Sequence, residues 1–148
     1  MENLRELFQV MTRRFGLLNK NCCQVGGNDI SLVQSHILYE LHRKDRPSMQ
    51  QVADALGIDI TTFSRQIQTL VKEELVKKTP LPEDKRVSQL TLTTQGRDVA
   101  AKIDADMNQY LNEVFANMSE FEREMVIKSV KLLNEAMSKS TVCCKPFI

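Results

Sequence analysis

Apolar residues recur at helical spacing in two short segments near the middle of the chain, with a turn of about three or four residues between them. Ser48 and Gln51 form a capping box that opens the first segment at about residue 48. Gly57 suits the left-handed residue that ends this helix, and Asp59 can cap the next one. The pattern predicts a helix-turn-helix, whose apolar positions are Val52, Ala53, Leu56, Phe63, Ile67, Leu70 and Val71.

The remaining positions of the second helix carry hydroxyls, amides and one guanidinium. In a major groove, arginine can contact guanine and glutamine can contact adenine, and all of these groups can hold phosphates. The alternative is a solvated polar face, which an isolated helix would favour; the preceding turn and the following hairpin favour DNA. The predicted DNA-contact residues of the helix-turn-helix are Ser48, at the start of the first helix, and Thr61, Thr62, Ser64, Arg65, Gln66 and Gln68 of the second.

A charged loop, TPLPEDKR, follows the second helix and lies between two predicted strands. Pro80 and Pro82 supply no amide donors, so the loop is not expected to pair as sheet. Lys85 and Arg86 lie near its tip, where an arginine can enter a minor groove. We expect Asp84 to orient Arg86 or another arginine, the alternative being an ordinary surface ion pair. The predicted strands are 75–78 and 87–93.

In this order, the segments resemble the MarR family of bacterial transcription regulators. The resemblance lies in the helix-turn-helix ADALGIDITTFSRQIQTLVKEELV, the wing signature PEDKR and the exit LTLTTQG. It extends over about residues 30–100 in motif and over the whole chain in length and helix order. It implies a mainly α fold with a small β-hairpin, a winged helix-turn-helix with N- and C-terminal dimerisation helices. It also implies a homodimer that binds a palindromic operator in double-stranded DNA, and a repressor is the expected form.

Apolar stripes at both ends of the chain call for a packing partner. They predict helices over 2–21 and 94–118, and a last helix opened by the capping box of Ser119 and Glu122. In the resembled family such helices interlock across a two-fold axis; the alternative is packing within one subunit. Phe8, Met11, Phe121 and Met125 are expected to be buried there. A helix over 30–43, opened by Ser31 and Gln34, would connect the parts of one domain, 1–148, in which 30–97 is the winged-helix region and 1–29 and 98–148 dimerise.

Composition and charge agree with a globular DNA-binding protein. The chain has 148 residues, 42% hydrophobic and 26% charged, which is enough to bury a real core. The net charge of +1 alone argues against nucleic acid, but residues 43–97 carry ten Lys/Arg against seven Asp/Glu, whereas residues 98–148 carry six against eight. No segment resembles a membrane span or a secretion signal, so we expect a cytoplasmic protein that does not contact membrane.

The four cysteines form two adjacent pairs, Cys22-Cys23 and Cys143-Cys144. In a cytoplasm they should be reduced, and two neighbouring thiols can bind a soft metal ion. If the chain ends interlock, the pairs could meet and sense an oxidant or a metal; the alternative is that they are small buried apolar residues. In the organic-peroxide-sensing branch of the resembled family an N-terminal cysteine reacts, sometimes with a C-terminal one from the other subunit.

No enzyme signature is found: the chain lacks a glycine-rich phosphate loop and a nucleophile elbow, and His36 and His42 do not stand at metal-ligand spacing with the cysteines. We therefore expect no catalytic residues and no cofactor. The main hypothesis is a sequence-specific DNA-binding repressor that is released from DNA by a small ligand or by a thiol or metal event. Two alternatives are a winged-helix module that docks on another protein, and a redox or metal-binding protein built around the cysteines.

Overall fold

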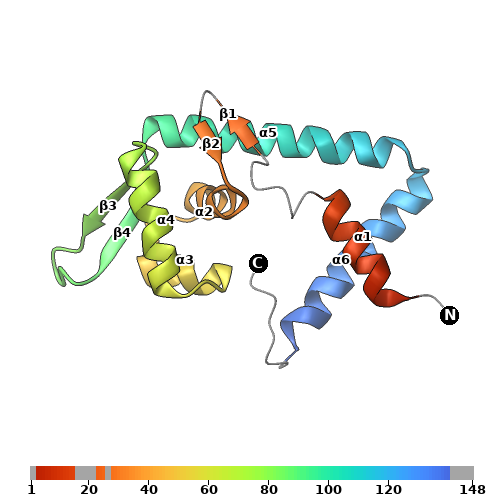
Figure 1. The fold of residues 1–148 in the computed structure, drawn as a ribbon, viewed down its shortest axis with the longest axis horizontal. Helices are drawn as coiled ribbons and strands as arrows, with labels where there is room; N and C mark the ends of the chain where they lie inside the picture. Colours follow the sequence, from red (N-terminus) through yellow and green to blue (C-terminus); the bar gives the residue numbers. More distant parts are fainter. Residues whose placement is uncertain (1–2, 16–22, 26–27, 141–148) are drawn as a thin grey trace. The chain divides into compact units, whose positions relative to one another are not determined.

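The computed structural model describes residues 3–15, 23–25 and 28–140 (Figure 1). The described chain is mainly helical with a small hairpin, as expected. It forms two compact units, Met1–Ile103 and Asp104–Phe147, and none of its helices is long and apolar enough to cross a membrane. The elements are α1 (Leu4–Arg14), β1 (Cys23–Val25), β2 (Asn28–Ile30), α2 (Leu32–Arg43), α3 (Met49–Leu56), α4 (Ile60–Lys72), β3 (Val76–Pro80), β4 (Ser88–Leu92), α5 (Thr94–Ala116) and α6 (Glu120–Ser138).

Reciprocal capping boxes open three of the helices. At α3 the Gln51 amide donates to Ser48 Oγ at 3.1 Å, and the Ser48 amide donates to Gln51 Oε1 at 2.9 Å. Ser31 with Gln34 does the same for α2, and Ser119 with Glu122 for α6. These boxes satisfy amides that would otherwise lack partners, so the sequence positions of all three helix starts are confirmed.

The hydrophobic core lies in the first unit and is built by the end of β2, by α2, α3 and α4, by the β3–β4 hairpin and by the start of α5. The hairpin is antiparallel, with its register running from Val76 opposite Leu92 to Pro80 opposite Ser88. The other edge of β4 meets the chain just before α3, because the Leu90 amide donates to the Pro47 carbonyl at 2.8 Å. The buried core residues are Ile30, Ile37, Leu38, Leu41, Val52, Ala53, Phe63, Ile67, Leu70, Leu75, Val76, Leu90, Leu92, Val99 and Ala100.

Three features differ from the expectations drawn from sequence. The helix predicted over 2–21 is shorter, since α1 ends at Arg14 with Phe15 as its C-cap. The β1–β2 hairpin was not predicted. The loop was expected to stay unpaired, but Thr79 and Pro80 belong to β3. Proline lacks only a donor, which an edge strand tolerates at its end.

The first turn of α5 packs against the corner where α4 ends and β3 begins. The Thr93 hydroxyl donates to the Glu74 carbonyl at 2.6 Å and accepts from the Gly96 amide at 2.9 Å. The Thr93 amide donates to the Leu75 carbonyl at 3.1 Å. A Cβ on Gly96 would overlap the Leu75 carbonyl oxygen, so this position requires glycine.

Replacing Gly96 by alanine should destabilise the protein by about 2 kcal/mol or more, because the added methyl group must push the backbone of Leu75 away. Urea unfolding of wild type and variant measures the loss. Gln95→Ala, at the exposed neighbouring position, is the control and should change stability by less than about 0.5 kcal/mol. A Gly96→Ala protein as stable as wild type would contradict the close approach of α5 to Leu75.

Candidate nucleic-acid interface

A three-residue turn, Gly57 to Asp59, connects α3 to α4. Gly57 adopts the left-handed conformation, φ 65° and ψ 29°, and the Ile58 amide donates to the Ala53 carbonyl at 3.0 Å. Asp59 then starts α4, because its Oδ1 accepts from the Thr62 amide at 2.9 Å. The turn therefore has the geometry of a helix-turn-helix, with each helix end satisfied by local hydrogen bonds.

One face of α4 is buried and the opposite face is polar. Phe63, Ile67 and Leu70 enter the core. Thr61, Arg65 and Gln68 are exposed, and their spacing of four and three residues places them on one face of the helix. The predicted contact residues Thr62 (exposed), Ser64 and Gln66 (both half-buried) also lie on α4.

The negative charge of Asp59 at the start of α4 disfavours binding of a phosphate by the backbone amides of this helix end. Side chains of α4 are therefore better placed than these amides to contact a phosphate. The hydrogen bonds from Thr62 lower the pKa of the Asp59 carboxyl, so this group is negative at neutral pH. An anionic cap stabilises the helix through its interaction with the helix dipole, but it repels a phosphate at the same helix end. At the other helix, the half-buried Ser48 accepts the Gln51 amide, which leaves its hydroxyl hydrogen for an outside partner.

The tip of the β3–β4 hairpin holds one guanidinium in a fixed orientation. Arg86 Nε donates to Asp84 Oδ1 at 3.0 Å, and its Nη2 donates to Oδ2 at 3.3 Å. The Arg86 amide also donates to Oδ1, at 3.1 Å. The Arg86 side chain is nevertheless 91% exposed, so its remaining N–H groups face solvent beside the exposed Lys85.

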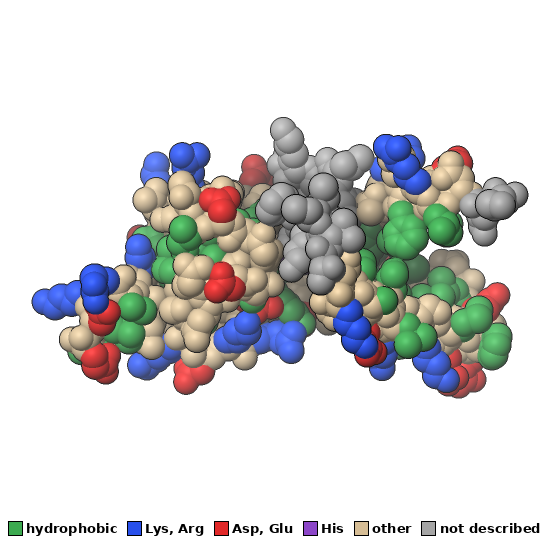
Figure 2. All heavy atoms as spheres, turned by 90° about the horizontal axis from the view of Figure 1, so that it is seen from below, with side chains coloured by type: hydrophobic (Ala, Val, Ile, Leu, Met, Phe, Trp, Pro, Cys, Tyr) green, Lys and Arg blue, Asp and Glu red, His purple; other side chains and the backbone are tan. Residues whose placement is uncertain are grey.

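The same contact changes the titration of the wing. Hydrogen bonds from the Arg86 side chain, and then from its amide, hold the pKa of the Asp84 carboxyl below its usual value of 3.8. Figure 2 shows Lys and Arg side chains at the wing tip, at the left of the view, with Asp and Glu side chains close by. The surface is therefore not uniformly basic, and individual arginines matter more here than a broad positive field.

Comparisons with known proteins agree with this geometry. A sequence model described as the MarR family matches residues 30–88. The HTH-type transcriptional regulator MhqR of Bacillus subtilis is 26% identical over 134 residues, which cover 88% of this chain and 90% of that protein. The chain is therefore similar to MarR-family regulators, and the matched segment contains the helix-turn-helix and most of the β3–β4 hairpin.

Two further similarities extend the comparison. The uncharacterized HTH-type transcriptional regulator YdgJ of Bacillus subtilis is 28% identical over 98 residues, which cover 66% of this chain but only 60% of YdgJ. The crystal structure of Streptococcus pneumoniae FabT in complex with DNA has a TM-score of 0.81 at 18% identity and covers 91% of this chain and 95% of FabT. This last similarity shows that the fold shared with FabT extends beyond the segment matched by the family model.

The segment that the MarR-family model matches, residues 30–88, contains every predicted DNA-contact residue. The cysteine pairs lie elsewhere: Cys22, Cys143 and Cys144 fall outside the described residues, and of Cys23 only the backbone, in β1, is described. Among the described residues, no cluster of three or more His, Cys, Asp or Glu side chains could hold a metal ion. The sequence predicted the LTLTTQG segment as a motif, but it did not predict that Thr93 and Gly96 hold α5 against Glu74 and Leu75. The glycine in the first turn of a predicted helix was the available signal for this close contact.

The bidentate contact at the wing predicts a measurable titration. In a carbon-detected NMR titration, the Asp84 carboxyl should titrate below 3.8, because the charged form accepts three hydrogen bonds. The contact between Asp84 and Arg86 should therefore be intact above pH 3.8 and should be lost as the pH falls through the lowered pKa of Asp84. Arg86→Gln should return the Asp84 pKa towards 3.8, whereas Lys85→Gln, at the neighbouring position, should return it far less. An Asp84 pKa that does not respond to Arg86→Gln would contradict the contact.

Proposed function

We propose that this chain is a DNA-binding transcriptional regulator of the MarR family that acts as a homodimer on a palindromic operator. The observation that carries the proposal is the joint placement of two features on one core: the exposed polar face of α4 and the wing-tip guanidinium oriented by Asp84. A rigid support of this kind is what base recognition requires, because a helix and a wing must enter adjacent grooves together.

The chemistry of the predicted contact residues separates those that suit base edges from those that suit phosphates. Arg65 and Gln68 on the exposed face of α4 suit the edges of guanine and adenine in a major groove. Arg86 suits a narrow minor groove, where the electrostatic potential is most negative. Phosphate contacts would position the protein without reading sequence. They are assigned to Ser48, Thr61, Thr62, Ser64, Gln66 and Lys85. The FabT structure, whose fold this chain shares, was solved with DNA bound, which supports the proposal.

Exposed apolar faces on the terminal helices support a second copy of the chain as partner. Neither α1 nor α6 contains a buried residue. In the single chain Phe8, Met11, Phe121 and Met125 are 40%, 52%, 73% and 50% exposed, so they are not buried by their own subunit. Hydrophobic side chains of this kind are visible at the surface in Figure 2. A two-fold dimer would cover these side chains and would place two winged helix-turn-helix units on a palindromic operator.

The proposed regulation is repression in the cytoplasm, relieved when a small ligand or a thiol or metal event changes the shape of the dimer. An effector shifts the equilibrium only if it binds one dimer shape more tightly than the other. The cysteine pairs Cys22-Cys23 and Cys143-Cys144 are the proposed sensor for the thiol or metal form of this control. Their adjacency in sequence is what supports this, since two neighbouring thiols can bind a soft ion or form a disulfide with a second pair.

Variants of the two arginines test recognition. Arg65→Ala should weaken binding to the DNA upstream of the chain's own gene by about 10- to 100-fold and relax base preference, because a bidentate base contact contributes ~1–3 kcal/mol. Arg86→Ala should lower affinity through loss of the minor-groove contact. Asp84→Asn, which keeps the Arg86 charge but loosens its orientation, should fall between Arg86→Ala and wild type.

Electrophoretic mobility measures these affinities, and Lys72→Ala is the matched control because it removes a positive charge from the last turn of α4. If folded Arg65→Ala and Arg86→Ala proteins both bound as wild type does, the assignment of the DNA contacts would be wrong.

A charge on the apolar face of α6 tests assembly. Met125→Asp should dissociate or unfold the dimer, because a carboxylate cannot be buried without a partner. Sedimentation velocity at micromolar concentration should show a dimer for wild type and for Lys131→Asp, which places the same charge at an exposed polar position of the helix. A stable wild-type monomer at this concentration would reject the homodimer.

The cysteine proposal is tested by operator binding with and without peroxide or a thiophilic metal. Either agent should reduce wild-type affinity by about 5- to 150-fold, a coupling of ordinary size for two linked sites. The Cys143→Ser/Cys144→Ser protein should not respond. An unresponsive wild type, or an equal response of the variant, would exclude the tail cysteines as sensor and favour a small-molecule effector.

A further inference from the structure

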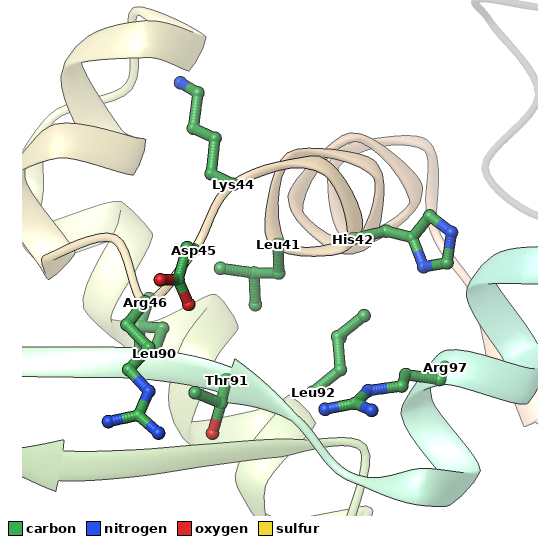
Figure 3. A pocket seen from close by; sticks show the side chains of 9 residues that line it. All are labelled: Leu41, His42, Lys44, Asp45, Arg46, Leu90, Thr91, Leu92 and Arg97. Atoms are coloured by element: carbon green, nitrogen blue, oxygen red, sulfur yellow. The ribbon is translucent and has the colours of Figure 1, made fainter.

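A polar pocket of about 560 Å³ lies within the first unit, between the end of α2, strand β4 and the start of α5 (Figure 3). It uses none of the residues assigned above to DNA contact. Buried Leu41, Leu90 and Leu92 form part of its wall, and the rest of the lining is mostly polar. The volume falls in the range of sites that hold small metabolites and is far larger than a single small ion needs.

Two guanidinium groups in this pocket have no partner in the described part of the chain. Arg46 lies on the loop after α2 and Arg97 on the first turn of α5, and neither side chain forms a hydrogen bond or ion pair with a described residue. Lys44 also lines the pocket, but its ammonium group is bound to Glu40 at 2.7 Å. The available positive charge therefore belongs to the two arginines, against one carboxylate, Asp45.

The backbone holds Arg46 in a conformation that non-glycine residues rarely adopt. Its φ is 45°, in the left-handed region, and Pro47 follows it directly. Such a conformation costs free energy and persists where the surrounding structure fixes it, often at binding sites. Here the Pro47 carbonyl is fixed by the Leu90 amide at 2.8 Å, which ties this loop to β4. In Figure 3 the Arg46 and Arg97 side chains lie on either side of the Thr91 hydroxyl.

We propose that this pocket binds a phosphorylated sugar or polyol. Guanidinium groups bind phosphate oxygens through charge-assisted, often bidentate hydrogen bonds, and the Thr91 hydroxyl adds a donor between Arg46 and Arg97. The Asp45 carboxylate disfavours a bare anion but accepts hydrogen bonds from ligand hydroxyls, as does one nitrogen of a neutral His42 ring. The lining thus combines phosphate recognition with hydroxyl recognition.

The position of the pocket gives such a ligand a structural consequence. Arg46 lies two residues before Ser48, the N-cap of α3, and Arg97 follows Gly96, where α5 contacts Leu75. A phosphate held by both arginines would tie the loop before the helix-turn-helix to the first turn of α5. This inference goes beyond DNA binding, and the binding step can be measured without DNA.

Calorimetry of the full chain at constant ionic strength tests the site, with ribose 5-phosphate, inorganic phosphate and ribose as probes. Ribose 5-phosphate should bind saturably and more tightly than inorganic phosphate, and ribose should not bind. Arg97→Gln and Arg46→Asn, whose new side chain tolerates a left-handed backbone, should each weaken binding about tenfold or more. Lys72→Gln, which removes a charge outside the pocket, should not weaken it. Thermal unfolding without ligand verifies that the variants fold.

Absence of saturable binding by ribose 5-phosphate, or equal binding by the folded arginine variants, would overturn the proposal. Inorganic phosphate binding as tightly as ribose 5-phosphate would overturn the sugar assignment. A further arm measures duplex DNA: if Arg97→Gln loses DNA affinity and DNA displaces ribose 5-phosphate from wild type, the arginines belong to a DNA-backbone contact instead. Loss of DNA binding in Arg65→Ala with phosphate binding retained would separate this site from the proposed DNA interface.

Discussion

The fixed geometry of the winged helix-turn-helix depends on a backbone contact that only glycine permits. Gly96 brings the first turn of α5 against the Leu75 carbonyl, while the Thr93 hydroxyl binds the carbonyl of Glu74. Leu75 is buried where α4 ends and β3 begins, so this one corner connects α4, the β3–β4 hairpin and α5. In the proposed dimer, a change in α5 would therefore reach the proposed DNA-contacting elements through hydrogen bonds and close packing.

Sequence reasoning succeeded where structure is decided locally. A capping box, the left-handed Gly57 and the Asp84–Arg86 contact each involve residues at most five positions apart, so the residue types and their spacing are sufficient. It failed where distant segments meet. The pairing of Pro80 with Ser88 and the contact of Gly96 with Leu75 depend on the tertiary fold. The pocket between Arg46 and Arg97 has the same origin, because those residues are far apart in sequence.

The apolar stripes show a second limit of sequence. Periodicity marks α4 and α6 alike as amphipathic, yet Phe63 of α4 is fully buried while Phe121 of α6 is 73% exposed in the single chain. An apolar stripe indicates that one face of a helix packs against other apolar residues, but it does not show whether these residues belong to the same chain or to a second subunit. The core of the winged unit is completed within the chain, whereas the terminal helices leave their apolar surface for the proposed second subunit.

Hydroxyl-radical and dimethyl-sulfate footprinting of wild type on its own upstream DNA tests the central claim, that α4 and the wing read DNA as a two-fold pair. The account predicts two guanine-N7 protected patches in the major groove, centred about one helical turn (~10 bp) or a multiple of it apart, with minor-groove protection outside each patch. A single unpaired patch, or no protection at saturating protein, would contradict it.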